Sequence, residues 1–124
     1  MARIFITGSA GGLGQLSARL LIEQGHKVVL HARNVERGHD ALKKNPDAET
    51  VVIADLSNLE ETKRLAWEVN ELGTFDAVIH NAGVYQTSSK EIFAVNTLAP
   101  YSLTCLIRKA KRLIYLSSGL QSHE

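Results

Sequence analysis

The fold is decided by a stretch near the start of the chain, Arg3-Ile4-Phe5-Ile6-Thr7-Gly8-Ser9-Ala10-Gly11-Gly12-Leu13-Gly14. An apolar run with strand character comes first, glycines follow in quick succession, and helical periodicity begins at about Gly12. Glycine lets the chain turn tightly and lets backbone amides approach a ligand closely, while Gly14 allows close contact between helix and strand. The stretch therefore predicts a strand, a glycine turn and a helix.

The N-terminus of this helix predicts a binding site for the pyrophosphate of a dinucleotide. The first amides of a helix have no intrahelical partner, and the helix dipole is positive there, so phosphate oxygens are favoured. A purely structural turn is the alternative, but the βαβ pattern around the turn favours the dinucleotide. The candidate cofactor-binding residues here are Thr7, Gly8, Ser9, Gly12, Leu13 and Gly14.

Strand-like and helix-like segments alternate along the remaining chain, which predicts one α/β domain over residues 1–124. Such alternation is typical of a parallel sheet with helices on both faces, because parallel neighbours need long crossovers. The expected strands are 2–7, 27–30, 50–54, 75–80 and 112–116. The expected helices are 12–24, 34–44, a third from the capping-box sequence Ser57-Asn58-Leu59-Glu60 to Leu72-Gly73, and a last one over 89–109 that contains Pro100.

The first helix is expected to pack on the sheet through one apolar side. Its apolar residues at helical spacing are Leu13, Leu16, Leu20 and Leu21. Gly25 follows directly and is expected to end the helix in a left-handed conformation.

Composition excludes several classes of function. The 14 basic and 13 acidic residues leave a formal charge of +1 without a basic block, so a nucleic-acid partner is not expected. No apolar run approaches the length of a membrane span. The single cysteine, Cys105, lies in an apolar run, and we therefore expect a reduced, cytoplasmic protein. The five histidines lack the spacing of a metal site.

The choice of cofactor is indicated by the residues around the end of the second strand, His31-Ala32-Arg33-Asn34. An acidic residue at this corner accepts hydrogen bonds from a ribose hydroxyl, whereas arginine accommodates a 2′-phosphate. No carboxylate occupies this corner until Glu36, while Arg33 and Arg37 offer two guanidinium groups. We therefore expect NADP rather than NAD, with Arg33 as a solvated loop charge being the alternative.

Taken together, several motifs resemble those of the short-chain dehydrogenase/reductase family over essentially the whole chain. The spacing Thr7-Gly8-x-x-x-Gly12-x-Gly14 is the first of them. The others follow in the family's order, namely Asp55-Leu56, His80-Asn81-Ala82-Gly83, Val95-Asn96 and Tyr115-Leu116-Ser117-Ser118-Gly119. His80 departs mildly from the commoner asparagine. The resemblance implies a Rossmann-like sheet of order 3-2-1-4-5 and an oxidoreductase that moves a hydride between NADP(H) and a carbonyl or alcohol substrate.

The same resemblance implies roles for individual residues. Asp55, with Leu56 beside it, would approach the adenine ring, and Asn81, Ala82 and Gly83 would form the cofactor wall. Ser118 would hydrogen-bond the substrate oxygen, with Ser117 as the less favoured register, and Asn96 would belong to the catalytic group. Pro100 lacks the amide that would bond the carbonyl of Asn96, so we hypothesise that it frees that carbonyl to hold a water, a simple packing kink being the alternative.

The family's Tyr-x-x-x-Lys motif does not occur in this sequence, because the residues four positions after its three tyrosines are Ser89, Cys105 and Gly119. Without that tyrosine, proton transfer loses its donor, so we expect binding without turnover by these 124 residues. Three explanations stay open: a truncated piece of a full enzyme that lacks the last strands, a short form completed by a partner or by self-association, or a non-catalytic NADP-binding regulator. The resemblance also implies that a homo-oligomer can form.

Overall fold

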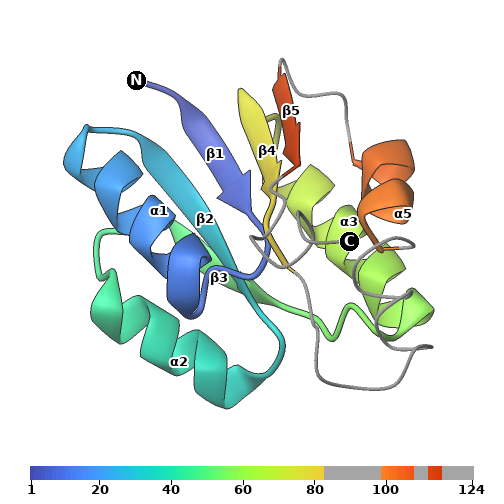
Figure 1. Cartoon of the computed structure of the whole chain (residues 1–124). Helices are drawn as coiled ribbons and strands as arrows, with labels where there is room; N and C mark the ends of the chain where they lie inside the picture. The colour runs from blue at the N-terminus through green and yellow to red at the C-terminus, as the bar shows by residue number, and fades with distance from the viewer. Residues whose placement is uncertain (83–98, 108–111, 116–124) are drawn as a thin grey trace, which may run out of the picture.

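The structure is a computed structural model, and it describes residues 1–82, 99–107 and 112–115 (Figure 1). Its strands form one parallel sheet in the order β3-β2-β1-β4-β5, with β3 and β5 at the edges. The strands are β1 (Arg3–Ile6), β2 (Lys27–Ala32), β3 (Thr50–Ile53), β4 (Ala77–His80) and β5 (Arg112–Tyr115). The expected α/β class and strand order are thereby confirmed.

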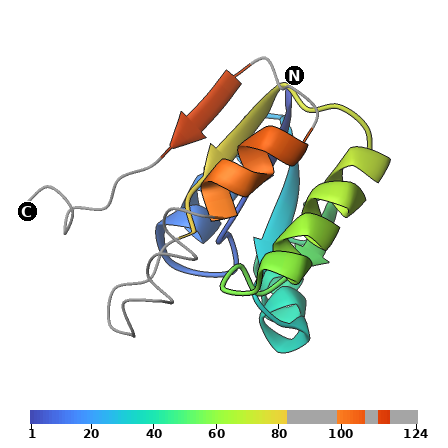
Figure 2. The same ribbon diagram turned by 90° about the vertical axis from the view of Figure 1, so that its right-hand side faces the viewer.

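Helices cover both faces of the sheet, as the parallel pairing requires. In Figure 2, α3 and α5 lie in front of the sheet, and α1 and α2 lie behind it. These helices are α1 (Gly12–Glu23), α2 (Val35–Lys44), α3 (Leu59–Glu71) and α5 (Ala99–Leu106). The carboxyl ends of β1, β2, β3 and β4 all meet the loops at one end of the sheet, which we call the carboxyl edge.

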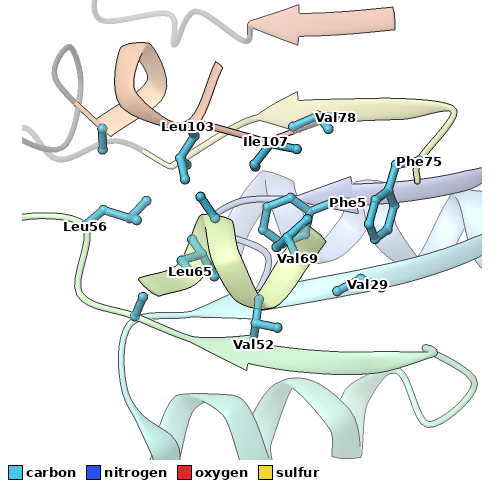
Figure 3. Close-up of a cluster of buried hydrophobic side chains, with 13 residues drawn as sticks. Phe5, Val29, Val52, Leu56, Leu65, Val69, Phe75, Val78, Leu103 and Ile107 are labelled. Carbon is cyan, nitrogen blue, oxygen red and sulfur yellow. The ribbon is translucent and has the colours of Figure 1, made fainter. Parts of the chain in front are cut away.

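The larger hydrophobic cluster fills the space between the sheet and the pair α3 and α5 (Figure 3). Ala99, Leu103 and Ile107 recur at intervals of four and therefore share one face at the α5 helix. They meet Leu65 and Val69 of α3 in this cluster. Burial of these side chains fixes α3 and α5 on the sheet.

The expectation that α1 packs on the sheet through its leucine side is wrong. The buried residues of α1 are Gly14 and Ala18, while Leu13, Leu16 and Leu20 are 61%, 47% and 50% exposed. Small residues face the sheet because they let the helix backbone approach the strands closely. A second hydrophobic cluster contains Ala18 together with buried residues of β1 and β2. Of the four leucines expected to pack, only Leu21 lies against this cluster.

Other boundaries move by one to three residues. The N-cap of α3 is Asn58, whose side chain accepts from the Glu61 amide, so the helix is capped one residue later than Ser57. The Glu61 side chain accepts from the Asp55 amide and not from the Asn58 amide, so the expected capping box is not closed. The α5 helix ends at Leu106 and not at Lys109, and residues 89–98 of the expected last helix lie outside the described part. Gly25 does end α1, with a φ of 93°. The β2 strand continues to Ala32, two residues beyond the expected Leu30, which places His31 inside the strand.

Candidate functional site

The glycine turn between β1 and α1 has the backbone conformation that its glycines permit. Gly8 and Gly12 have φ values of 65° and 58°, in the left-handed region. A Cβ at Gly8 would lie 2.8 Å from the Cα of Ala82, so the turn passes directly against the segment after β4. A Cβ at Gly14 would collide with the Gly8 carbonyl and with the side-chain nitrogen of Asn81. The turn and the start of α1 are thus packed backbone against backbone.

The N-terminus of α1 differs from those of the next two helices. Asn34 caps α2 and Asn58 caps α3 through their side chains, whereas α1 has Gly11 as its N-cap and no side-chain cap. A Cβ at Gly12 would meet nothing within 4 Å among the described residues. The amides in the first turn of α1 therefore lie at the positive end of the helix dipole without a side-chain cap.

Two side chains fasten the turn to the end of β4. The Thr7 hydroxyl, almost fully buried, accepts hydrogen bonds from the amides of Asn81 at 3.0 Å and Ala82 at 3.1 Å. In return, the Asn81 side chain donates to the Gly8 carbonyl at 3.1 Å. These bonds tie residues more than seventy positions apart, so the wall after β4 and the glycine turn form one unit.

Two further side chains fasten the turn to β2. The Gly8 amide donates to Nδ1 of His31 at 2.8 Å, and Nε2 of His31 lies 2.9 Å from the carbonyl oxygen of Ala54. The Ser9 hydroxyl is fully buried, donates to the Ile6 carbonyl at 2.9 Å and accepts from the His31 amide at 2.8 Å. Ser9 therefore holds the turn from inside, and a direct contact between Ser9 and a cofactor stays a prediction.

The residues expected to choose the cofactor lie together beside the turn. A Cβ at Gly11 would lie 3.0 Å from a guanidinium nitrogen of Arg37, so the Arg37 side chain reaches back from α2 over the turn. A guanidinium nitrogen of Arg33 lies 3.9 Å from a carboxylate oxygen of Asp55, with the Arg33 side chain 57% exposed. Arg37 thus borders the uncapped helix end, and Arg33 lies beside Asp55.

Asp55 is held in a defined orientation after β3. Its carboxylate accepts from the amide of Ser57 at 3.0 Å and from the hydroxyl of Ser57 at 2.7 Å, and its own amide donates to Glu61. Partial burial raises the pKa of the Asp55 carboxyl, but the Ser57 hydrogen bonds and the Arg33 charge outweigh burial and leave the pKa below its ordinary value. Leu56, the next residue, is buried in the larger hydrophobic cluster.

The remaining candidates divide between this edge and the part of the chain that the structure does not describe. Leu13 is exposed at the first turn of α1, and Ala82 packs partly against the core. Gly83, Asn96, Ser117 and Ser118 lie outside the described residues, so their implied roles, and the hypothesis about Pro100, stay predictions.

Sequence reasoning noticed His31 only as part of the corner after the second strand. The signal available was a histidine at a position where an apolar, fully buried strand residue is typical.

Two further features concern metal binding and membrane spans among the described residues. No group of described His, Cys, Asp or Glu side chains could hold a metal ion. No helix among the described residues is long and apolar enough to cross a membrane.

Comparison with known proteins points to one family. Residues 2–111 match the family model described as short chain dehydrogenase. An uncharacterised oxidoreductase of Emericella nidulans is 57% identical, over 95% of this chain and 51% of its own. The short-chain dehydrogenase chyC of Penicillium rubens is 47% identical, over 97% of this chain and 49% of its own. The chain thus spans about half the length of these curated relatives.

Solved structures give the same result. A putative betaketoacyl-ACP reductase superposes with a TM-score of 0.81 at 25% identity, over 99% of this chain and 56% of its own. The RhlG/NADP complex of Pseudomonas aeruginosa superposes with a TM-score of 0.79 at 25% identity, over 94% and 54%. A metagenomic short-chain oxidoreductase in complex with NADP gives 0.76 at 28% identity, over 94% and 62%. The motifs, the sheet order and these matches agree, and the chain belongs to the short-chain dehydrogenase family.

Proposed function

We propose that this chain binds NADP(H) at the carboxyl edge of its sheet, and that the site serves hydride transfer between NADP(H) and a carbonyl or alcohol substrate. One observation carries the proposal: the uncapped N-terminus of α1 opens beside the glycine turn, with the Arg37 guanidinium over Gly11. Unpaired amides, a positive helix end and adjacent cations are what a phosphorylated dinucleotide requires.

The residues of this edge fit the parts of the cofactor. The first amides of α1 would hold the pyrophosphate. Gly8 passes close to Ala82, so little space separates the start of the turn from the segment after β4. Arg33 and Arg37 would hold the 2′-phosphate, and Asp55 would border the adenine ring. When bound, the nicotinamide supplies or accepts the hydride. The protein's part is to orient the dinucleotide against a rigid backbone.

NADP is favoured over NAD by the charges at the end of β2. Arg33 and Arg37 are cations, and the carboxylate beside Arg33, that of Asp55, has both of its oxygens engaged by Ser57 or Arg33. The Asp55 oxygens are therefore less available to accept from a ribose hydroxyl, whereas the two guanidinium groups can donate to a 2′-phosphate. Two structurally similar proteins were solved with NADP, which supports the same choice.

The catalytic half of the proposal rests on the family resemblance. Ser118 would orient the substrate oxygen and Asn96 would hold a water, while Tyr-x-x-x-Lys is not found in the 124 residues. We therefore propose binding without turnover for this chain by itself. The chain spans about half of its relatives' length. The second candidate function is therefore a module that a partner completes, or one that only binds NADP.

The binding proposal is tested by titrating the chain with NADPH and with NADH, following the fluorescence of the reduced nicotinamide. NADPH should bind more tightly, and Arg33→Ala and Arg37→Ala should each weaken NADPH by roughly tenfold with little effect on NADH, because each removes a charge-assisted contact. Arg19→Ala, an exposed arginine farther along α1, is the matched control. Equal affinities for both dinucleotides in all variants would refute the NADP assignment.

The two candidate functions are separated by an assay of NADPH oxidation over a panel of ketones and aldehydes. The assay is run on this chain and on the natural gene product, whose length is first established by intact mass. An enzyme predicts turnover when the Tyr-x-x-x-Lys segment is present and none for this chain alone. Tight NADPH binding without turnover in a natural product of 124 residues would favour the binding module.

A further inference from the structure

We propose that His31 is a positioning residue for the dinucleotide site, in which a neutral imidazole fixes the glycine turn through the Gly8 amide and thereby sets the affinity for the dinucleotide. The inference goes deeper into the proposed function and rests on it, since the turn is taken to hold the pyrophosphate. The geometry of the ring and its partners is independent of that function.

The partners of the His31 ring fix where its hydrogen lies. The Gly8 amide can only donate, so Nδ1, 2.8 Å away, must accept with its lone pair. The Ala54 carbonyl can only accept, so Nε2, 2.9 Å away, must carry the hydrogen. One neutral tautomer satisfies both bonds. The imidazolium form would place an N–H against the N–H of Gly8 and break the link to the turn.

The main chain of His31 strengthens the same connection. Its amide donates to the Ser9 hydroxyl at 2.8 Å, and its carbonyl accepts from the Ser9 amide at 3.1 Å. The residue is 3% exposed, so none of these bonds is replaced easily by water. His31 therefore binds two consecutive residues of the turn and, through Ala54, the end of β3. It sets the position of Gly8 relative to the corner that carries Asp55.

The groups around the ring favour its neutral form. Burial lowers the pKa of His31, and this effect outweighs the Ala54 carbonyl and the Asp55 carboxylate, which both raise it. Asp55 is itself paired with the Arg33 guanidinium, which weakens its effect on the ring. Residues 7–14 and β3 carry no titratable side chain, and β1 contributes only Arg3, at its opposite end. His80 ends β4, on the far side of β1, and is the other buried histidine at this edge.

Two substitutions separate the two ring contacts. In His31→Asn the side-chain oxygen lies near the position of Nδ1 and keeps an acceptor for the Gly8 amide. In His31→Gln the amide group reaches the position of Nε2 and keeps a donor for Ala54, but leaves Gly8 without its acceptor. We expect NADPH affinity within about twofold of the natural chain for His31→Asn and about tenfold weaker for His31→Gln. A His31→Gln variant that binds as tightly as His31→Asn would overturn the proposal.

A second readout distinguishes failure of this inference from failure of the proposed function. Hydrogen exchange of the Gly8 amide is measured by NMR without any dinucleotide. Protection should persist in His31→Asn and fall in His31→Gln, and equal protection would overturn the positioning role. If the natural chain does not bind NADPH at all, the proposed function fails, and the exchange result alone decides on His31.

A pH titration serves if His31→Gln does not fold. Because burial lowers the pKa of His31, the NADPH affinity of the natural chain should fall at a pH below the ordinary pKa of histidine, whereas His31→Asn should lack that component. The 2′-phosphate and His80 titrate in both proteins, so the difference between the two profiles isolates His31. Superimposable profiles would overturn the proposal.

Discussion

The two ends of the sheet are fastened in different ways. At the amino end, the Arg3 side chain binds the carboxylate of Glu49 and lies 4.5 Å from the centre of the Phe75 ring. The Arg3 amide donates to the Asp76 carboxylate at 2.8 Å, and the Ala2 amide donates to His26 at 2.9 Å. Most of these groups are partly exposed, and they tie the strand starts together.

At the carboxyl edge, side chains that are buried (Thr7 and His31) or half-buried (Asn81) bind the backbone instead. Thr7, His31 and Asn81 each make hydrogen bonds with main-chain groups of the turn or of the wall after β4, while the first turn of α1 is left uncapped. The amino end is thus held by contacts between partly exposed groups, whereas the carboxyl edge is held by bonds to its backbone, where the dinucleotide site is proposed. Substitutions at the amino end should therefore change stability alone, and those at the carboxyl edge should change stability and binding together.

The largest effect is expected for Gly8→Ala. The substitution combines a positive φ, which costs an L-residue about 1–2 kcal/mol, with overlap against the backbone of Ala82, which adds about 1–3 kcal/mol. Gly25→Ala is the matched control, since Gly25 also has a positive φ but meets nothing within 4 Å. Urea unfolding and NADPH titration should show a loss of about 4 kcal/mol with lost binding for Gly8→Ala, against about 1 kcal/mol with normal binding for Gly25→Ala. Equal losses would contradict the close approach.

A somewhat smaller effect is expected from pH, through His80. Burial lowers the pKa of His80 to about 4, so the unfolded chain binds the proton first. Stability should be full above about pH 6.5 and should fall as the pH drops from there towards 4, by up to about 3 kcal/mol. Urea unfolding over this range measures the loss, with His39→Asn, an exposed histidine, as control. A slope unchanged by His80→Asn would contradict the assignment.

At the amino end, Glu49→Gln should cost only about 1 kcal/mol, because both partners of its ion pair are partly exposed. The Arg3 hydrogen bond lowers the pKa of Glu49, so the ion pair contributes fully above about pH 4.5 and is lost as the pH falls through the lowered value. NADPH affinity should stay unchanged. A binding defect in Glu49→Gln would break the distinction between the two ends.

The smallest effect is expected away from both ends, on the outer face of α1. Leu20→Gln should change the free energy of unfolding by less than about 0.5 kcal/mol, because Leu20 is 50% exposed. Ala18→Leu, on the buried face, should instead cost about 1–3 kcal/mol by overpacking. A Leu20→Gln variant that unfolds as readily as Ala18→Leu would contradict the orientation of the helix.

The sequence predicted the parallel sheet and the glycine turn, because apolar strands and glycines carry strong local signals, whereas the strand order came from the family resemblance. It placed α1 the wrong way round, since a leucine stripe at Leu13, Leu16 and Leu20 has helical spacing whichever face is buried. What decides the face is the close approach of Gly14 to the Gly8 carbonyl. The glycine spacing predicts close contact at Gly14, but the leucine spacing points to a different face, and only the packed structure decides between them.

The structure places Gly8 and Arg37 at the glycine turn, as the sequence predicted, while their contacts with a cofactor stay predictions. The hydrogen bonds that hold the candidate site were harder to predict. His31 and Ser9 act through bonds to distant backbone groups, and those bonds exist only once β2 extends to Ala32 and passes beside the turn. Such contacts depend on register, which is set by the whole sheet.

The central claim, that the carboxyl edge binds the dinucleotide, is tested most directly by following the backbone amides of the 15N-labelled chain by NMR during titration with NADPH. We predict that the amides of Gly8, Gly11 and Gly12 shift together with those of Arg33 and Arg37, while those of Arg3 and Asp76 at the amino end stay in place. Absence of any shift at saturating NADPH, or shifts confined to the amino end, would contradict the account.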